Sequence, residues 1–159
     1  MGKCSGMIEQ LRDEKELDNV LEIKFPAISK NEKLARNIVA SILLDKNPRV
    51  EMLADIKTAV SEAVTNSVVH GYGHNGGDCL IIAKLKGDKF YIRIEDFGVG
   101  IKDIEQARQP FFTTGTNGDR SGMGFTVMET FMDEVEISNQ KQGSGLVVEM
   151  VKVLDVSEK

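Results

Sequence analysis

Two apolar, β-branched segments lie so close together in the sequence that they limit the type of sheet the chain can form. Residues 79–85 and 90–96 are separated only by residues 86–89, whose Gly-Asp centre is typical of a tight turn. Strands joined this closely run antiparallel, because a parallel pair needs a crossover of about a dozen residues or more. The sequence therefore predicts a β-hairpin within a sheet that is mixed or largely antiparallel.

Hydrophobic periodicity predicts three helices. The first follows Ser29 and Glu32, which fit a capping box. The second follows Asn47 and Pro48, which fit an N-cap and a first-turn proline, and its apolar spacing predicts a long, mostly buried helix. The third begins near Phe125.

Alternating or β-branched patterns predict further strands at residues 21–25, 135–138 and 146–153. Strands and helices are interleaved, yet neighbouring strands meet through short turns. The predicted fold is therefore α+β: a two-layer α/β sandwich with a mixed, mostly antiparallel sheet and helices on one face. We expect residues 1–18 to form a flexible polar leader and residues 19–154 to form one domain.

Charge and cysteine content exclude several classes of protein. The net charge of −5 disfavours direct contact with the phosphates of a nucleic acid. Cys4 and Cys79 are too few for a disulfide framework and indicate a reducing, cytoplasmic compartment. No stretch reaches the roughly 18 apolar residues that a membrane helix needs, and no signal peptide opens the chain. We expect a cytoplasmic protein that does not cross a membrane.

Glu62 and Asn66 form the first candidate site. They lie four residues apart, on one face of the second predicted helix. An amide oxygen is a suitable ligand for Mg²⁺, and a nearby carboxylate can take a proton from a hydroxyl group. The alternative is an ordinary exposed polar pair on a helix surface.

A glycine-rich region from residue 96 to residue 124 contains the second candidate site. Asp96 ends a predicted strand and is followed by Gly98 and Gly100, which allow close backbone approach to a ligand, while an ionised Asp suits the amino group of adenine. The alternative is a plain strand-terminating turn. Residues 120–125 then open the third helix with accessible N–H groups that fit a phosphate. Residues 71–76 match the sequence pattern of a dinucleotide-binding motif. They follow a predicted helix and precede a predicted strand, which is the reverse of that motif's structural context, so we interpret them as a turn.

The order and spacing of these motifs resemble the ATP-binding fold shared by DNA gyrase, the Hsp90 chaperones, sensor histidine kinases and the mismatch-repair ATPases. More narrowly, residues 62–66, 95–101, 107–110 and 121–125 are similar to the sporulation anti-sigma F factors, a family of serine kinases. The resemblance extends from about residue 21 to about residue 151. It implies an ATP-binding kinase domain of the Bergerat type.

The resemblance also implies a role for each site residue, with ATP and Mg²⁺ as cofactors. Glu62 corresponds to the catalytic base, Asn66 to the magnesium ligand and Asp96 to the adenine-binding carboxylate. Gly98 and Gly100 correspond to hinges of a lid over ATP, which we expect at residues 109–121. The other residues implied to bind the cofactor are Thr113, Thr114, Arg120, Ser121, Gly122, Met123, Gly124 and Phe125.

The resemblance implies a homodimer that holds a sporulation sigma factor inactive and phosphorylates a serine of its antagonist, an anti-anti-sigma factor. Arg36 corresponds to a contact with both partners; the alternative is a solvated arginine on a helix face. The alternative function is a histidine-kinase-like catalytic module or a stand-alone ATPase, although Glu62 stands where sensor kinases typically place a histidine. One departure is Gly145, where the family usually has threonine, so a polar group that supports Asp96 is expected to be missing.

Overall fold

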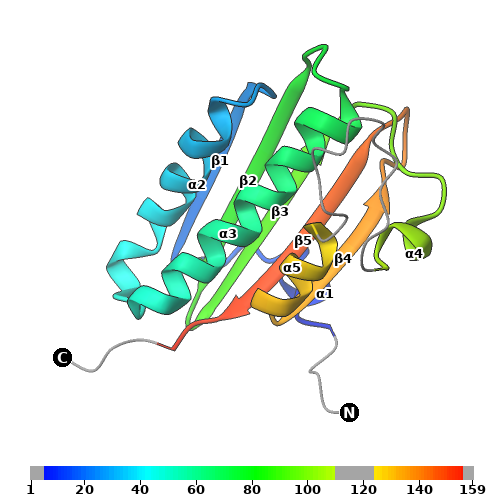
Figure 1. The fold of residues 1–159 in the computed structure, drawn as a ribbon. Helices are drawn as coiled ribbons and strands as arrows, with labels where there is room; N and C mark the ends of the chain where they lie inside the picture. The colour runs from blue at the N-terminus through cyan, green and yellow to red at the C-terminus, as the bar shows by residue number, and fades with distance from the viewer. Residues whose placement is uncertain (1–5, 110–123, 156–159) are drawn as a thin grey trace.

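The computed structural model describes residues 6–109 and 124–155. They form two layers, a five-stranded antiparallel sheet and a layer in which α2, α3 and α5 lie on one face of it (Figure 1). The strand order is β1-β2-β3-β5-β4, so β1 and β4 are the edges. The elements are α1 (Met7–Arg12), β1 (Asn19–Pro26), α2 (Asn31–Ile42), the 3₁₀ turn η1 (Leu44–Lys46), α3 (Val50–Asn66), the π-helical turn η2 (Ser67–Gly71), β2 (Asp78–Lys86), β3 (Lys89–Asp96), α4 (Ile104–Ala107), α5 (Gly124–Phe131), β4 (Glu134–Asn139) and β5 (Leu146–Val153).

The predicted hairpin is confirmed as β2 and β3. Lys86 pairs with Lys89, and Gly87 at the turn has a φ of 58°, a left-handed conformation that glycine adopts without steric penalty. The register places Cys79 opposite Asp96 at the other end of the hairpin. That end of the sheet therefore holds both the start of β2 and the candidate carboxylate.

The helix starts differ from their predicted positions. Lys30, rather than Ser29, is the N-cap of α2 and makes no side-chain cap bond, and Glu32 instead accepts a hydrogen bond from Arg36. The capping box is therefore wrong. Asn47 ends η1 with a φ of 49°, and α3 begins only after Arg49, so the predicted N-cap and first-turn proline are wrong as well. The second helix is nevertheless long, and η2 continues it.

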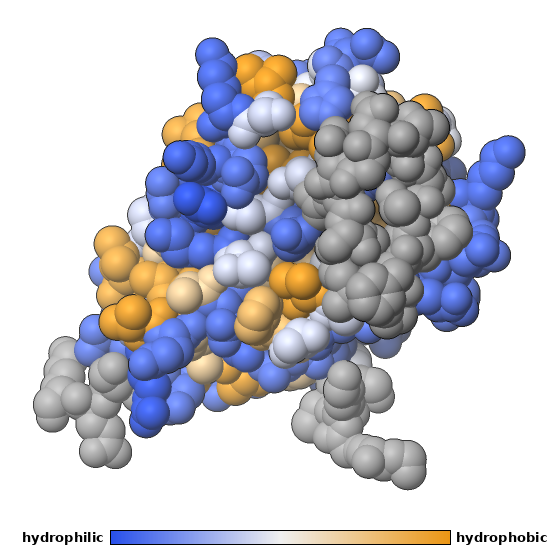
Figure 2. Space-filling view, in the orientation of Figure 1, coloured by the Kyte–Doolittle hydropathy of each residue, from blue (hydrophilic) through white to orange (hydrophobic). Residues whose placement is uncertain are grey.

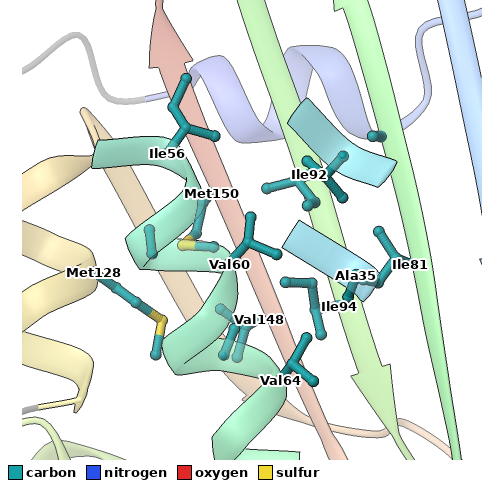
Figure 3. Close-up of a cluster of buried hydrophobic side chains, with 14 of the residues drawn as sticks. Ala35, Ile56, Val60, Val64, Ile81, Ile92, Ile94, Met128, Val148 and Met150 are labelled. Atoms are coloured by element: carbon teal, nitrogen blue, oxygen red, sulfur yellow. The ribbon is translucent and has the colours of Figure 1, made fainter. Parts of the chain in front are cut away.

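The core lies between α3 and the sheet. Figure 3 shows Ile56, Val60 and Val64 of α3 facing the side chains of the central strands. The labelled strand residues are Ile81, Ile92, Ile94, Val148 and Met150. Helical spacing in α3 and alternation in the strands thus bury one continuous apolar layer, which packs α3 across the sheet.

The residues expected to form a flexible leader contain α1, which packs on the opposite face of the sheet. Ile8 and Leu11 are buried against Tyr91 and Val151. Arg12 donates hydrogen bonds from Nε and Nη2 to the Glu149 carboxylate, both at 2.9 Å. The expectation of a flexible leader is wrong for this helix, because its docking partners lie more than 70 residues away in sequence, where local patterning gives no signal.

Arg12→Ala is expected to lower the free energy of unfolding by about 2–3 kcal/mol at neutral pH, because it leaves the buried Glu149 carboxylate without its main cation. Burial opposes ionisation of Glu149, but hydrogen bonds from Arg12 and Tyr91 outweigh it and hold the pKa of Glu149 below its ordinary value. The stability that this carboxylate contributes is present above the ordinary glutamate pKa and is lost as the pH falls through the lowered pKa. Urea unfolding should therefore show a smaller deficit in acid than at neutral pH.

The matched control is Lys24→Ala, which removes an exposed ion pair with Asp78 at 3.4 Å. A pair so open to water is expected to contribute less than about 1 kcal/mol. Equal losses in the two variants, or an Arg12→Ala deficit that does not change with pH, would contradict the proposed contribution of the α1 contact.

The helical face of the molecule carries both hydrophilic and hydrophobic side chains (Figure 2). Leu34 in α2, Leu44 in η1 and Val50 at the start of α3 are exposed, and Val50 is 80% exposed. Within the two described ranges, no helix is long and apolar enough to cross a membrane.

Candidate functional site

Asp96 is a buried carboxylate at the end of β3, with only 2% of its surface exposed. Its Oδ1 accepts hydrogen bonds from the backbone N–H of Gly98 at 3.0 Å and of Leu146 at 3.2 Å. Burial raises the pKa of Asp96, while the hydrogen bonds from Gly98, the Ser67 hydroxyl and Leu146 oppose the rise. The fold thus holds one carboxylate in a defined orientation at the edge of the core.

Three glycines allow the backbone to close around Asp96. A Cβ on Gly98 would lie 2.0 Å from the Gly71 carbonyl oxygen, and a Cβ on Gly145 would lie 2.1 Å from the Asp96 carbonyl oxygen. A Cβ on Gly71 would lie 3.1 Å from the Asp96 carboxyl atoms. Backbone atoms cannot move aside as flexible side chains do, so positions 98 and 145 need glycine. At position 71, a Cβ would press on the Asp96 side chain.

Gly145 therefore has no room for the threonine expected from the family pattern. The polar support of Asp96 comes instead from Ser67 and from the Leu146 amide. A side chain at position 145 is thus absent, as expected, while these two groups hydrogen-bond Asp96.

The far end of the loop after Asp96 is held by Asn139 of β4. Its Oδ1 accepts a hydrogen bond from the Ile101 N–H at 2.9 Å, and its Nδ2 donates to the Ile101 carbonyl at 2.7 Å. Gly100 adopts a φ of 71° beside it. Both predicted hinge glycines, Gly98 and Gly100, thus lie in a loop that is fixed at each end.

Glu62 and Asn66 lie on α3, one helical turn apart. Glu62 is half-buried, whereas Asn66 is buried with 7% of its surface exposed. The Asn66 Nδ2 atom is buried and has no hydrogen-bond partner among the described residues, which is unusual for a buried amide and fits a polar ligand that completes the site. Ser67, the next residue, hydrogen-bonds Asp96, so the end of α3 and the end of β3 meet directly after Asn66.

The remaining predicted site residues fall into three groups. The structure places Gly124 at the start of α5 and buries the Phe125 side chain in the core, against α3. Arg36 lies on α2, where its Nη1 pairs with Glu32 at 3.3 Å and its Nε is buried without a partner among the described residues. The predicted residues that lie outside the described ranges are Thr113, Thr114, Arg120, Ser121, Gly122 and Met123, together with most of the predicted lid.

Sequence reasoning missed Ser67, Gly71, Tyr72 and Asn139. Residues 71–76 do form a turn, but Gly71 also packs against Asp96 and Gly98. A glycine at position 71 could have indicated a close backbone approach. Asn139 is distant in sequence from the other site residues, so no local pattern indicated its role.

The sequence of the chain has known relatives. Residues 25–152 match the histidine kinase-like ATPase domain family. The anti-sigma F factor of Thermoanaerobacter sp. (strain X514) is 48% identical over 139 residues, which cover 87% of this chain and 96% of that protein. The anti-sigma F factor of Bacillus licheniformis is 44% identical over 143 residues, covering 89% of this chain and 97% of that protein.

Solved structures share the fold at much lower sequence identity. The structure of the RsbU and RsbW domains of Rv1364c from Mycobacterium tuberculosis aligns with a TM-score of 0.61 and 20% identity, covering 86% of this chain and 32% of that chain. The catalytic domain of the histidine kinase ThkA aligns with a TM-score of 0.54 and 16% identity, covering 84% of this chain and 96% of that chain. At these identities the likeness concerns the fold alone.

Proposed function

Because the chain belongs to the anti-sigma F factors, within the histidine kinase-like ATPase family, we propose that it inhibits a sporulation sigma factor and acts as an ATP-dependent serine kinase. Its substrate is then the anti-anti-sigma factor, which phosphorylation inactivates. The names of the relatives support the partners, and the family supports ATP as the cofactor. The observation that carries the nucleotide site is the buried Asp96 carboxylate, enclosed by glycines and hydrogen-bonded by Ser67, the residue after Asn66.

Asp96 would bind the adenine base of ATP. Its carboxylate accepts hydrogen bonds but does not donate them when ionised, so it complements the amino group of adenine rather than the carbonyl of guanine. Gly71 and Gly98 allow the backbone to pack closely beside this carboxylate. The backbone N–H groups of Gly98 and Leu146 both donate to Oδ1, which fixes the orientation of the carboxylate toward a base.

Asn66 would bind Mg²⁺ through its side-chain oxygen. The unpartnered, buried Nδ2 fits a side chain whose orientation is completed by a ligand. When bound, Mg²⁺ neutralises charge on the phosphates during transfer. Glu62, one turn earlier on α3, would accept the proton of the substrate serine as its oxygen attacks.

Sigma-factor binding would use a surface that includes Arg36 of α2. Arg36 pairs through Nη1 with Glu32 at 3.3 Å, and its side chain is 34% exposed, so the outer end of the guanidinium can donate to a protein partner. The chain would act as a homodimer, as the resemblance to the anti-sigma F factors implies.

The proposed function is tested with purified partners encoded in the same genome. The chain should retain the sigma factor on an affinity column in the presence of ATP and Mg²⁺. It should also transfer the γ-phosphate of ATP to a serine of the anti-anti-sigma factor, identified by mass spectrometry. Transfer to a histidine, or ATP hydrolysis without transfer and without sigma-factor retention, would contradict the proposal.

A further inference from the structure

Tyr72 joins two strands at the edge of the candidate site. Its hydroxyl donates a hydrogen bond to the Asp78 carbonyl at 2.6 Å and accepts one from the Phe97 N–H at 2.7 Å. Asp78 begins β2, and Phe97 directly follows the last residue of β3. One side-chain oxygen therefore connects the start of one strand with the end of its neighbour.

These two backbone groups would otherwise face each other in the sheet. The last registered pair of β2 and β3 is Cys79 with Asp96, so Asp78 and Phe97 occupy the next position of the ladder. In an antiparallel pair, such opposed groups hydrogen-bond directly at alternate positions. Here both groups bond the Tyr72 hydroxyl instead, so the tyrosine bridges the two strands just beyond their last registered pair.

The hydrogen bond from the Phe97 N–H to the Tyr72 hydroxyl sets the direction of the chain immediately after Asp96. The next two amides are also held, since Gly98 N–H bonds the Asp96 carboxylate at 3.0 Å and Val99 N–H bonds the Gly71 carbonyl at 3.0 Å. Of the three amides from 97 to 99, only that of Phe97 is held by a side chain from another element. The Tyr72 hydroxyl thus anchors the loop that carries Asp96.

The tyrosine ring is itself held in a space that requires a glycine. A Cβ on Gly77 would lie 2.2 Å from Cε1 of the Tyr72 ring. The Tyr72 backbone is fixed by a hydrogen bond from its N–H to the Ser67 carbonyl at 3.0 Å, at the end of the π-helical turn. Burial raises the pKa of Tyr72, while the Phe97 N–H opposes the rise, so the hydroxyl keeps the proton it donates to Asp78 at neutral pH.

We propose that Tyr72 is a positioning residue for adenine recognition: its hydroxyl, inserted between β2 and β3, sets the direction of the loop after Asp96 and so fixes where the carboxylate meets the base. Tyr72 acts through Asp96 and does not need to touch the nucleotide. The inference rests on the proposed function, because it assigns a role within the same nucleotide site.

The test is Tyr72→Phe, with Tyr91→Phe as a matched control. These are the two tyrosines of the chain, and Tyr91 donates its hydroxyl to Glu149 at 2.5 Å, on the α1 side of the sheet. Tyr72→Phe is expected to weaken ATP binding about tenfold and to move the ratio of ATP to GTP affinity toward one, because an anchoring hydrogen bond is lost. Tyr91→Phe is expected to lower the melting temperature while leaving this ratio at the wild-type value.

The ratio of ATP to GTP affinity distinguishes a positioning role of Tyr72 from a purely structural one. A Tyr72→Phe protein that melts at a lower temperature but keeps the wild-type ATP affinity and ATP-to-GTP ratio would overturn the inference. If Tyr72→Phe does not fold, the Gly77→Ala variant provides the test. The added Cβ at position 77 displaces the Tyr72 ring but leaves its hydroxyl in place on the side chain. We expect that variant to lose ATP selectivity, and unchanged selectivity would again overturn the inference. A wild-type chain that binds neither nucleotide would contradict the proposed function instead.

Discussion

The Glu62→Gln protein is expected to phosphorylate the anti-anti-sigma factor about 10²–10⁴-fold more slowly than the wild type, because glutamine keeps the shape of the side chain but cannot accept the serine proton. Glu62 is half-buried on α3, one turn from Asn66, so the isosteric change should leave the helix intact. Transfer of label from radioactive ATP to the purified substrate measures the rate. Nucleotide affinity and sigma-factor retention should remain close to wild type.

Arg36→Ala is the companion variant in the same assays. Arg36 lies on α2, and its described side-chain contact is with Glu32 rather than with the residues around Asp96. The variant should lose retention of the protein partners and keep its affinity for ATP. A Glu62→Gln protein that transfers phosphate at the wild-type rate would refute the assignment of Glu62 as the base.

Gly98→Ala is expected to weaken ATP binding at least tenfold and to lower the free energy of unfolding by about 1–3 kcal/mol. The new Cβ would lie 2.0 Å from the Gly71 carbonyl oxygen, so η2 and the loop after Asp96 must separate. That movement breaks the hydrogen bond from the Val99 N–H to Gly71 and shifts the Asp96 carboxylate. Calorimetry with ATP and urea unfolding measure the two effects.

Gly87→Ala is the control for this variant. Gly87 lies at the distant β2–β3 turn, where an added Cβ would meet nothing within 4 Å, although its φ of 58° makes alanine unfavourable there. It should lose about 1 kcal/mol of stability with unchanged ATP affinity. A Gly98→Ala protein that binds ATP as tightly as Gly87→Ala would show that close packing around Asp96 is not required for nucleotide binding.

Most of the sheet could be predicted from the sequence because its strands are short, alternating or β-branched, and joined by clear turns. The hairpin of β2 and β3 and the strands β4 and β5 were confirmed at nearly the predicted bounds. The long second helix was also confirmed, since Ile56, Val60 and Val64 repeat at helical spacing and are fully buried. In both cases a local pattern and the tertiary contacts agree.

The helix starts and the N-terminal segment could not be predicted from local patterns. Ser29 and Asn47 have the chemistry of caps, but their backbones serve other turns in the structure. The docking of α1 depends on Arg12 reaching Glu149, a pairing between opposite ends of the chain. A side chain with such a distant partner gives no periodic signal.

The candidate site was predicted only in part, for the same reason. The sequence proposed Asn66 and Asp96, and in the fold Ser67, the residue after Asn66, hydrogen-bonds Asp96. The π-helical turn after Asn66 inserts an extra residue into the helix, and this turn leads Gly71 and Tyr72 toward the loop after Asp96. No propensity distinguishes such a turn from a continued α-helix, so the contributions of Gly71 and Tyr72 emerge only from the structure.

The most direct test of the central claim, that Asp96 forms an adenine-selective nucleotide site, is calorimetric titration of the wild-type chain with ATP and with GTP in the presence of Mg²⁺. Guanine would place a carbonyl against the Asp96 carboxylate, and a buried acceptor without a donor costs about 1–3 kcal/mol, so ATP should bind about tenfold more tightly or better. Equal affinity for ATP and GTP would contradict the claim.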